Sequence, residues 1–168
     1  MSLTLILTRH AKSDWDDPSQ DDFDRPLNDR GRRSSPAIGK WLARKGYLPD
    51  VVLVSGARRT VETWTRMAPC LPETASMEST PALYLAEPEI ILNIIRSQTA
   101  PTVMVIGHNP GFAILAGALA ERPPDDPKFG QYPTAATTVF GFEANAWADI
   151  EPGTGKVLDF VVPRDLID

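Results

Sequence analysis

The stretch LTLILTRHAKSDWD, residues 3–16, decides the fold of this chain. It opens with an apolar, β-rich run and ends abruptly in Arg9 and His10. Such a run predicts a strand over residues 3–8 that is buried on both faces, as in a parallel sheet. Open α/β sheets bind their ligands at the carboxyl ends of their strands. We therefore expect Arg9 and His10 to lie at a ligand site.

The other of the chain's two histidines, His108, follows a second strand signal. Residues 103–106 read VMVI, and GHNPG follows at residues 107–111. Asn109 and Pro110 form an N-cap and first-turn pair, which predicts a helix directly after this histidine. Both histidines therefore stand at junctions of the same kind, where a buried strand ends.

Strands and helices alternate along the rest of the chain. Further strands are predicted over residues 51–54, 76–83, 135–142 and 156–162. Helices are predicted from Asn28 to Gly46, from Ala57, from Glu87 and after Asn109. Residues 13–26 and 122–133 are predicted loops, and residues 145–155 a turn. Pro36 falls inside the first helix, where it either bends the helix or marks its true first turn.

The alternation of strands and helices predicts the fold class. It favours an α/β protein, a three-layer α/β/α sandwich with a mostly parallel central sheet. The final pair of strands is expected to add antiparallel or edge strands. A length of 168 residues fits one domain over residues 1–168.

Composition excludes several functions. Apolar residues make up 42% of the chain and charged residues 23%, as in an ordinary soluble domain. The net charge of −5 argues against general nucleic-acid binding, which needs a basic face. No apolar run approaches the ~20 residues of a membrane span, and the lone Cys70 forms no disulfide within the chain. We expect a cytoplasmic monomer that binds neither nucleic acid nor membrane.

A third strand-to-helix junction carries Arg58 and Arg59. In a parallel sheet all three junctions lie at one edge, so their side chains can converge. Guanidinium groups and a helix N-terminus suit a phosphoryl dianion, and a neutral imidazole can attack phosphorus. Each feature alone is typical of ordinary structure, such as a hydrogen-bonding histidine or a solvated arginine. Their joint occurrence favours a functional site.

These stretches resemble the motifs of the histidine phosphatase superfamily, which has the phosphoglycerate-mutase-like fold. The matching stretches are LTRHAKS at residues 7–13, Ser55-x-x-x-Arg59-Thr60-x-Glu62-Thr63, and GHNPG at residues 107–111. Further matches are DRPL at residues 24–27 followed by Arg30-Gly31, and PTAA at residues 133–136. The short length and the wording RHAKS are most similar to SixA-type phosphohistidine phosphatases. The resemblance spans nearly the whole chain.

The resemblance implies a role for each matched residue. His10 would be the nucleophile that becomes phosphorylated. Arg9 and Arg59 would clamp the phosphoryl oxygens, and His108 would donate a further hydrogen bond to them. Ser13 and Asn109 are the other expected substrate-binding residues. The family needs no metal ion or cofactor, and no residues here have the spacing of metal ligands.

One further role in the family is that of a general acid, which protonates the leaving group. Family members that have one place a carboxylate after the third strand, and Glu87 is the best positional match. Glu87 and Glu89 could equally do no more than complement the helix dipole. Ala11 replaces the usual glycine, a small change. Asp16 replaces an asparagine of the mutase branch and would repel phosphate if it pointed inward.

The loop over residues 13–26 is rich in aspartate. It lacks the glycine and terminal glutamate of an EF-hand, and a solvated loop is the simplest interpretation. We also consider that Asp14, Asp16 and Asp17 form a negative rim around a positive pocket. Such a rim would disfavour small polyanionic substrates.

The leading interpretation is a metal-independent phosphomonoesterase that acts through phospho-His10 on phosphohistidine in proteins. One alternative is a small-molecule phosphatase or a phosphoglycerate-mutase-type enzyme acting on a small phosphomonoester. A mutase needs basic contacts for a second anionic group, and the sequence shows no such cluster. The other alternative is a module that binds phosphate without turnover.

Overall fold

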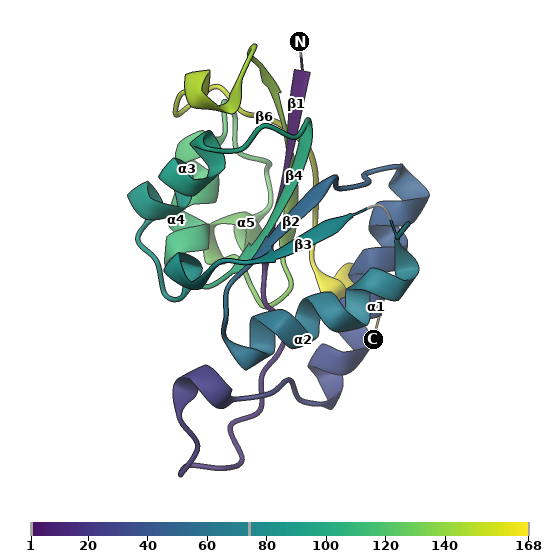
Figure 1. Ribbon diagram of the computed structural model, residues 1–168. Coiled ribbons are helices and arrows are strands. Elements are labelled where there is room, and N and C mark those ends of the chain that lie inside the picture. The colour runs from purple at the N-terminus through teal and green to yellow at the C-terminus, as the bar shows by residue number, and fades with distance from the viewer. Residues whose placement is uncertain (1, 74, 168) are drawn as a thin grey trace.

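A single six-stranded sheet forms the centre of the molecule in the computed structural model, which describes residues 2–73 and 75–167 (Figure 1). The strand order is β3-β2-β4-β1-β5-β6. In chain order the strands are β1 (Ser2–Arg9), β2 (Val51–Val54), β3 (Ser76–Ser79), β4 (Thr102–Gly107), β5 (Thr137–Glu143) and β6 (Lys156–Val161).

The sheet is mostly parallel, as the sequence predicts. Strands β3, β2, β4 and β1 run parallel to one another, whereas β5 pairs antiparallel with β1, and β6 with β5. The apolar run of β1 lies between β4 and β5, and Leu7 pairs with Val105. The predicted α/β class with late antiparallel strands is confirmed.

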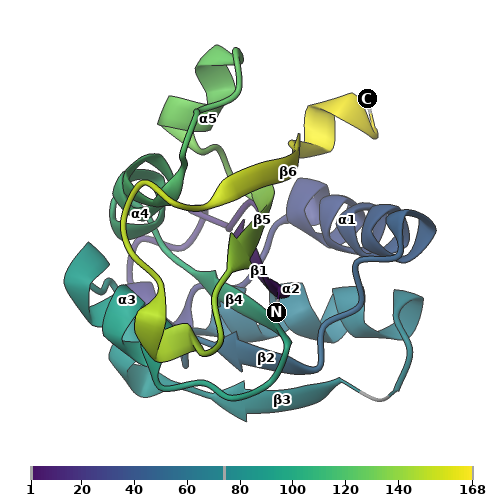
Figure 2. The same ribbon diagram turned by 90° about the horizontal axis from the view of Figure 1, so that it is seen from above.

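Helices cover both faces of the sheet (Figure 2). Helices α1 (Asp29–Lys45) and α2 (Arg58–Met67) lie on one side. Helices α3 (Pro88–Arg96), α4 (Gly111–Leu119) and α5 (Pro127–Gln131) lie on the other.

Alternate side chains of the buried strands supply the two apolar cores. In β1, Leu5 and Leu7 pack with α3 and α4, and Ile6 packs with α1 and α2. Because strand side chains alternate between the faces, each strand with helices on both sides must be apolar throughout. This requirement explains the continuous apolar runs in the sequence.

The ends of α1 match the expected signals. Asn28 caps the helix, and its Oδ1 accepts a hydrogen bond from the Gly31 amide at 2.9 Å. Gly46 ends it in the left-handed conformation, with φ of 77°. Pro36 therefore lies inside the helix and does not begin it.

Some local expectations are wrong. Residues 76–83 are not one extended segment, because β3 gives way to a 3-10 helix at Pro81–Leu83. The predicted loop 122–133 contains α5, which Asp126 caps by accepting from the Lys128 amide. Helix α4 begins only at Gly111, yet Asn109 still accepts a hydrogen bond from the Ala113 amide at 3.2 Å.

Short 3-10 helices also lie in segments where the sequence predicts no helix. They are η1 (Asp22–Asp24), η4 (Trp147–Asp149) and η5 (Pro163–Asp165). Three residues are too few to show a helical period in sequence, so pattern alone does not find them.

Candidate active site

A cavity of about 250 Å³ opens at the carboxyl edge of the parallel strands. We call it the catalytic cavity. It is lined by Arg9, His10, Lys12, Ser13, Trp15, Arg25, Arg59, Leu85, His108, Asn109 and Thr134. Each residue predicted for the site lines this cavity except Glu87.

The two histidines meet in this cavity. Their ring centroids are 5.3 Å apart, and the rings are tilted by 53°. His10 follows β1 and His108 follows β4, and these strands are neighbours in the sheet. Both rings are buried, with 6% of His10 and 2% of His108 exposed. The structure thus brings the two imidazoles together, as the equivalent junctions predict.

His10 is held as a neutral imidazole with one free nitrogen. Its Nδ1 lies 2.7 Å from the Ala11 carbonyl oxygen, which can only accept, so Nδ1 carries the proton and Nε2 a lone pair. Burial is the main cause that lowers the pKa of His10 to about 3, against the raising effect of the Ala11 carbonyl. The positive charge of Arg9 lowers it further. A neutral imidazole of this kind can act as a nucleophile near pH 7.

Arg9 and Arg59 place two guanidinium groups beside the histidines. Arg9 Nη1 donates to the Tyr132 carbonyl at 3.2 Å. Arg59 is 2% exposed and donates to the carbonyl of Asp22 at 2.7 Å and to its carboxylate at 3.0 Å. The buried Nε of each arginine has no hydrogen-bond partner within the described chain. Burial, and then the charge of Arg59, lowers the pKa of Arg9. Two like charges kept so close favour binding of an anion.

His108 contacts Ser55 and Arg59. Its Nε2 lies 2.7 Å from Ser55 Oγ, and its Nδ1 lies 3.3 Å from Arg59 Nη2. Arginine can only donate, so here Nδ1 accepts and Nε2–H donates to Ser55. A hydroxyl can also donate, so Ser55 is able to support the other tautomer, in which Nδ1 no longer accepts from Arg59 and Nδ1–H can donate to an anion. Burial, followed by the charge of Arg59, lowers the pKa of His108 to about 3.

Asp22 organises the cavity wall, and no pattern in the sequence singles it out. Its carboxylate accepts hydrogen bonds from Arg25 at 2.9 Å, Arg59 at 3.0 Å and Tyr84 at 2.5 Å. Although burial raises it, these three hydrogen bonds hold the pKa of Asp22 well below its usual range. Asp22 is one of several aspartates in an aperiodic loop, and only the folded structure distinguishes it from the others.

Glu87 and the suggested acidic rim stay outside the cavity. Glu87 is the exposed residue before α3, and its side chain makes no capping hydrogen bond. Asp14, Asp16 and Asp17 do not line the cavity either. Indeed, the described residues that line it include no aspartate or glutamate. Asp16 therefore does not line the cavity in which a phosphoryl group would bind.

Apolar groups stand at the mouth of the catalytic cavity. Trp15 is 72% exposed, and the Arg25 guanidinium lies 3.5 Å from its ring centroid. Arg25 also donates to the Ser13 hydroxyl at 2.6 Å. Leu85 is 54% exposed. The cavity therefore has a cationic base and exposed apolar side chains among its lining residues.

Asn109 lines the cavity and also links two segments of its wall. Its side-chain nitrogen donates to the carbonyls of Gln131 and Tyr132 at 3.2 and 3.0 Å, while its oxygen accepts from the Ala113 amide. Its amide thus ties the start of α4 to the end of α5. Arg58, the neighbour of Arg59, is exposed and does not line the cavity.

Residues 2–73 and 75–167 contain neither a candidate group of metal-binding side chains nor a helix that could span a membrane. No group of three or more histidine, cysteine, aspartate or glutamate side chains in this part of the chain is arranged to hold a metal ion. None of its helices has the length and apolar character that crossing a membrane requires.

Similarity to known proteins supports the family that the motifs indicate. Residues 5–84 match the histidine phosphatase superfamily (branch 1). An uncharacterised chloroplastic protein of Arabidopsis thaliana is 35% identical over 182 residues, which cover 99% of this chain and 81% of that protein. The chain belongs to the histidine phosphatase superfamily. This histidine phosphatase is accordingly a histidine-dependent enzyme.

Solved structures place the histidine phosphatase near the SixA type. A protein of Nakamurella multipartita assigned as the phosphohistidine phosphatase SixA superposes with a TM-score of 0.79 and 28% identity, over 97% of both chains. A protein of Agrobacterium tumefaciens with the same assignment gives a TM-score of 0.77 and 26% identity, over 96% of this chain and 98% of that one. The predicted resemblance to the SixA type is confirmed.

Proposed function

We propose that this histidine phosphatase hydrolyses phosphohistidine in proteins, through a phospho-His10 intermediate and without a metal ion. One observation carries the proposal: a buried neutral imidazole lies beside two arginines in a cavity whose described lining has no carboxylate. Such a site can bind and accept a phosphoryl group. It offers no carboxylic acid to protonate a poor leaving group.

In the first step, Nε2 of His10 attacks the phosphorus atom. The new N–P bond forms as the P–N bond of the substrate breaks, and the electron pair leaves with the substrate imidazole, which takes up a proton from water. Arg9 and Arg59 stabilise the charge on the phosphoryl oxygens. The Ala11 carbonyl keeps the His10 ring oriented through Nδ1–H.

In the second step, a water molecule attacks the phosphorus of phospho-His10. The bond to Nε2 breaks, its electron pair returns to the ring, and inorganic phosphate leaves with the oxygen of the water. The attacking water releases one proton, which replaces the proton that the substrate imidazole took from water in the first step. His108 donates a hydrogen bond from Nδ1 to a phosphoryl oxygen once Ser55 donates to Nε2. In this role Ser55 acts on the phosphoryl group only through His108.

The leaving group explains the preference for phosphohistidine. An alkyl phosphate expels an alkoxide, which general acid catalysis accelerates by roughly 10²–10⁴-fold. The imidazole of phosphohistidine is a much weaker base and needs less help. The exposed Trp15 at the cavity mouth suits a protein surface, because aromatic residues are enriched at interfaces.

A substrate panel with a trapping assay tests the proposal. Wild-type enzyme receives a phosphohistidine peptide, p-nitrophenyl phosphate and 3-phosphoglycerate, and alkaline denaturation preserves any phosphohistidine formed on the enzyme. We expect the highest kcat/KM on the peptide and a phosphoryl label on His10. His10→Ala should lose at least about 10⁴-fold in turnover with an unchanged circular dichroism spectrum.

Other results would assign other functions. A clear preference for 3-phosphoglycerate would favour a small-molecule enzyme. Phosphate binding with neither label nor turnover would identify a non-catalytic module. Label on a residue other than His10 would overturn the mechanism.

A further inference from the structure

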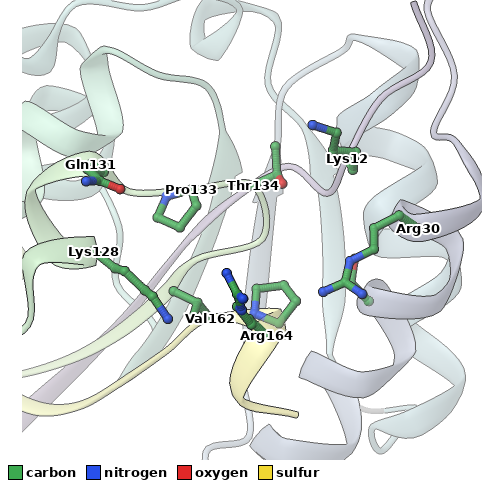
Figure 3. A pocket seen from close by; sticks show the side chains of 10 residues that line it. Lys12, Arg30, Lys128, Gln131, Pro133, Thr134, Val162 and Arg164 are labelled. Carbon is green, nitrogen blue, oxygen red and sulfur yellow. The ribbon is translucent and has the colours of Figure 1, made fainter. Parts of the chain in front are cut away.

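A second cavity of about 260 Å³ adjoins the catalytic one (Figure 3). We call it the basic cavity. Lys12 and Thr134 line both cavities, so the two share a wall. The remaining wall comes from α1, α5 and η5, which are far apart in sequence.

Four cationic side chains line the basic cavity: Lys12, Arg30, Lys128 and Arg164. Figure 3 shows Lys128 and Arg30 extending toward its centre from opposite sides, with Arg164 between them. No aspartate or glutamate is present among the described residues of the lining. Such a gathering of positive charge is unexpected in a chain with a net charge of −5, and it attracts anions.

One of these four charges, that of Lys128, is only weakly compensated by an ion pair. Asp165 lies 4.0 Å from Lys128 Nζ, at the limit of an ion pair, and its side chain is half-exposed. Exposed ion pairs of this kind contribute little to the free energy of folding, so Asp165 holds Lys128 only weakly.

The fold fixes one side of the basic cavity. A Cβ atom on Gly31 would lie 2.2 Å from the Lys12 carbonyl oxygen, so only glycine allows this approach. The Asn28 amide donates to the same oxygen at 3.0 Å. The first turn of α1 therefore packs directly on the backbone of Lys12, and this contact holds Lys12 and Arg30 on neighbouring segments.

We propose that the basic cavity binds a second anionic group of the substrate while the phosphoryl group occupies the catalytic cavity. The group is a carboxylate of an acidic residue near the phosphohistidine, or a second phosphate on a small substrate. For the peptide the inference rests on the proposed function. It corrects the sequence-based statement that no basic cluster exists, because the cluster is assembled from residues 12, 30, 128 and 164.

The test compares matched substrates on two double variants. Lys128→Gln/Arg164→Gln removes two cations from the basic cavity and leaves the shared Lys12 in place. Arg122→Gln/Lys156→Gln makes the same change in net charge at exposed positions that line neither cavity. One substrate pair is a phosphohistidine peptide flanked by aspartates or by alanines. The other is glycerol 1,3-bisphosphate against glycerol 1-phosphate.

The readout is the ratio of kcat/KM within each pair. We expect the wild type to prefer the more anionic member of at least one pair. The Lys128→Gln/Arg164→Gln variant should reduce that preference roughly tenfold, through KM, while the control variant keeps it. The preference should also shrink at high ionic strength. The pair that responds identifies the source of the anion.

Equal ratios for wild type and both variants in both pairs would overturn the inference. So would an equal fall in the control variant, because the effect would then come from net charge alone. The proposed function fails differently: the wild type would then hydrolyse neither phosphohistidine peptide, and the glycerol phosphate pair would still report on the basic cavity.

Discussion

The two adjoining cavities hold their cations in different ways. In the catalytic cavity, Arg59 is almost fully buried and fixed by Asp22. In the basic cavity, Arg164 is exposed, and Arg30 and Lys128 are half-exposed. Fixed charges need no reorganisation when charge develops in a transition state, so they raise the rate. Exposed charges contribute mainly to encounter and selectivity. Substitutions should therefore change kcat in one cavity and KM in the other.

The largest effect that separates the two cavities is expected at Arg59. Arg59→Ala removes a fixed cation from the phosphoryl group and should lower kcat/KM roughly a hundredfold to a thousandfold, with a large part in kcat. Steady-state kinetics on p-nitrophenyl phosphate measures this loss. Arg58→Ala is the matched control, because Arg58 is exposed and lines neither cavity. Similar losses in both variants would remove the distinction between fixed and exposed cations.

The next prediction concerns protonation of the two histidines. Burial lowers the pKa of both His10 and His108 to about 3, so neither imidazole should titrate between pH 8 and 5. NMR spectra of the rings measure this directly, since the chain has two histidines. A midpoint near 6.5 for either ring would contradict the buried, neutral state.

The same pKa values set the direction of a stability change. Below pH 6.5 the histidines of the unfolded chain bind protons, whereas those of the folded chain stay neutral until the pH nears 3. The free energy of unfolding therefore falls as the pH drops from 6.5 toward 3. Urea unfolding at several pH values checks the slope. His10→Asn should make it shallower, and an unchanged slope would count against His10 as a contributor.

A smaller effect is expected at Asp22. Asp22→Asn keeps the backbone contact with Arg59 but loses the ion pair, so kcat should fall roughly fivefold as Arg59 becomes less fixed. Inhibition by inorganic phosphate should become stronger, because a nearby negative charge is gone. Asp24→Asn, an exposed change in the same short helix, is the control. An unchanged kcat would mean that Asp22 does not position Arg59.

The smallest effect is expected at Glu87. Glu87→Gln should change kcat/KM on a phosphohistidine peptide less than about twofold, since a general acid is worth far more than this. Glu89→Gln is the matched control on the same helix. A hundredfold loss on an alkyl phosphate, absent from the control, would instead identify Glu87 as the general acid.

The sequence predicts what depends on strand order and local pattern. Continuous apolar runs gave β2 at its observed bounds and the positions of β1 and β4. His10 and His108 converge because both directly follow neighbouring parallel strands. Asn28 and Gly46 marked the ends of α1 through local backbone chemistry. For the strands and the helix ends, the signal and its cause lie within a few residues, and the convergence of the histidines follows from the parallel strand order.

The sequence does not predict contacts that form when a loop packs against residues far from it in the chain. Asp22 binds Arg59 across 37 positions, and no local pattern distinguishes it from the other aspartates of its loop. The basic cavity takes its cations from both ends of the chain. Helix α5 is five residues long, too short for a period. Charged side chains on such segments acquire partners only through tertiary structure.

The contact between Gly31 and the Lys12 backbone has a consequence for substrate choice. Because no side chain fits there, the first turn of α1 and the residue two positions after the nucleophile move as one piece. The backbone that carries the nucleophile and the backbone that carries Arg30 are then held at one separation. A substrate whose two charges are too near or too far apart would place one charge correctly and leave the other without a cation.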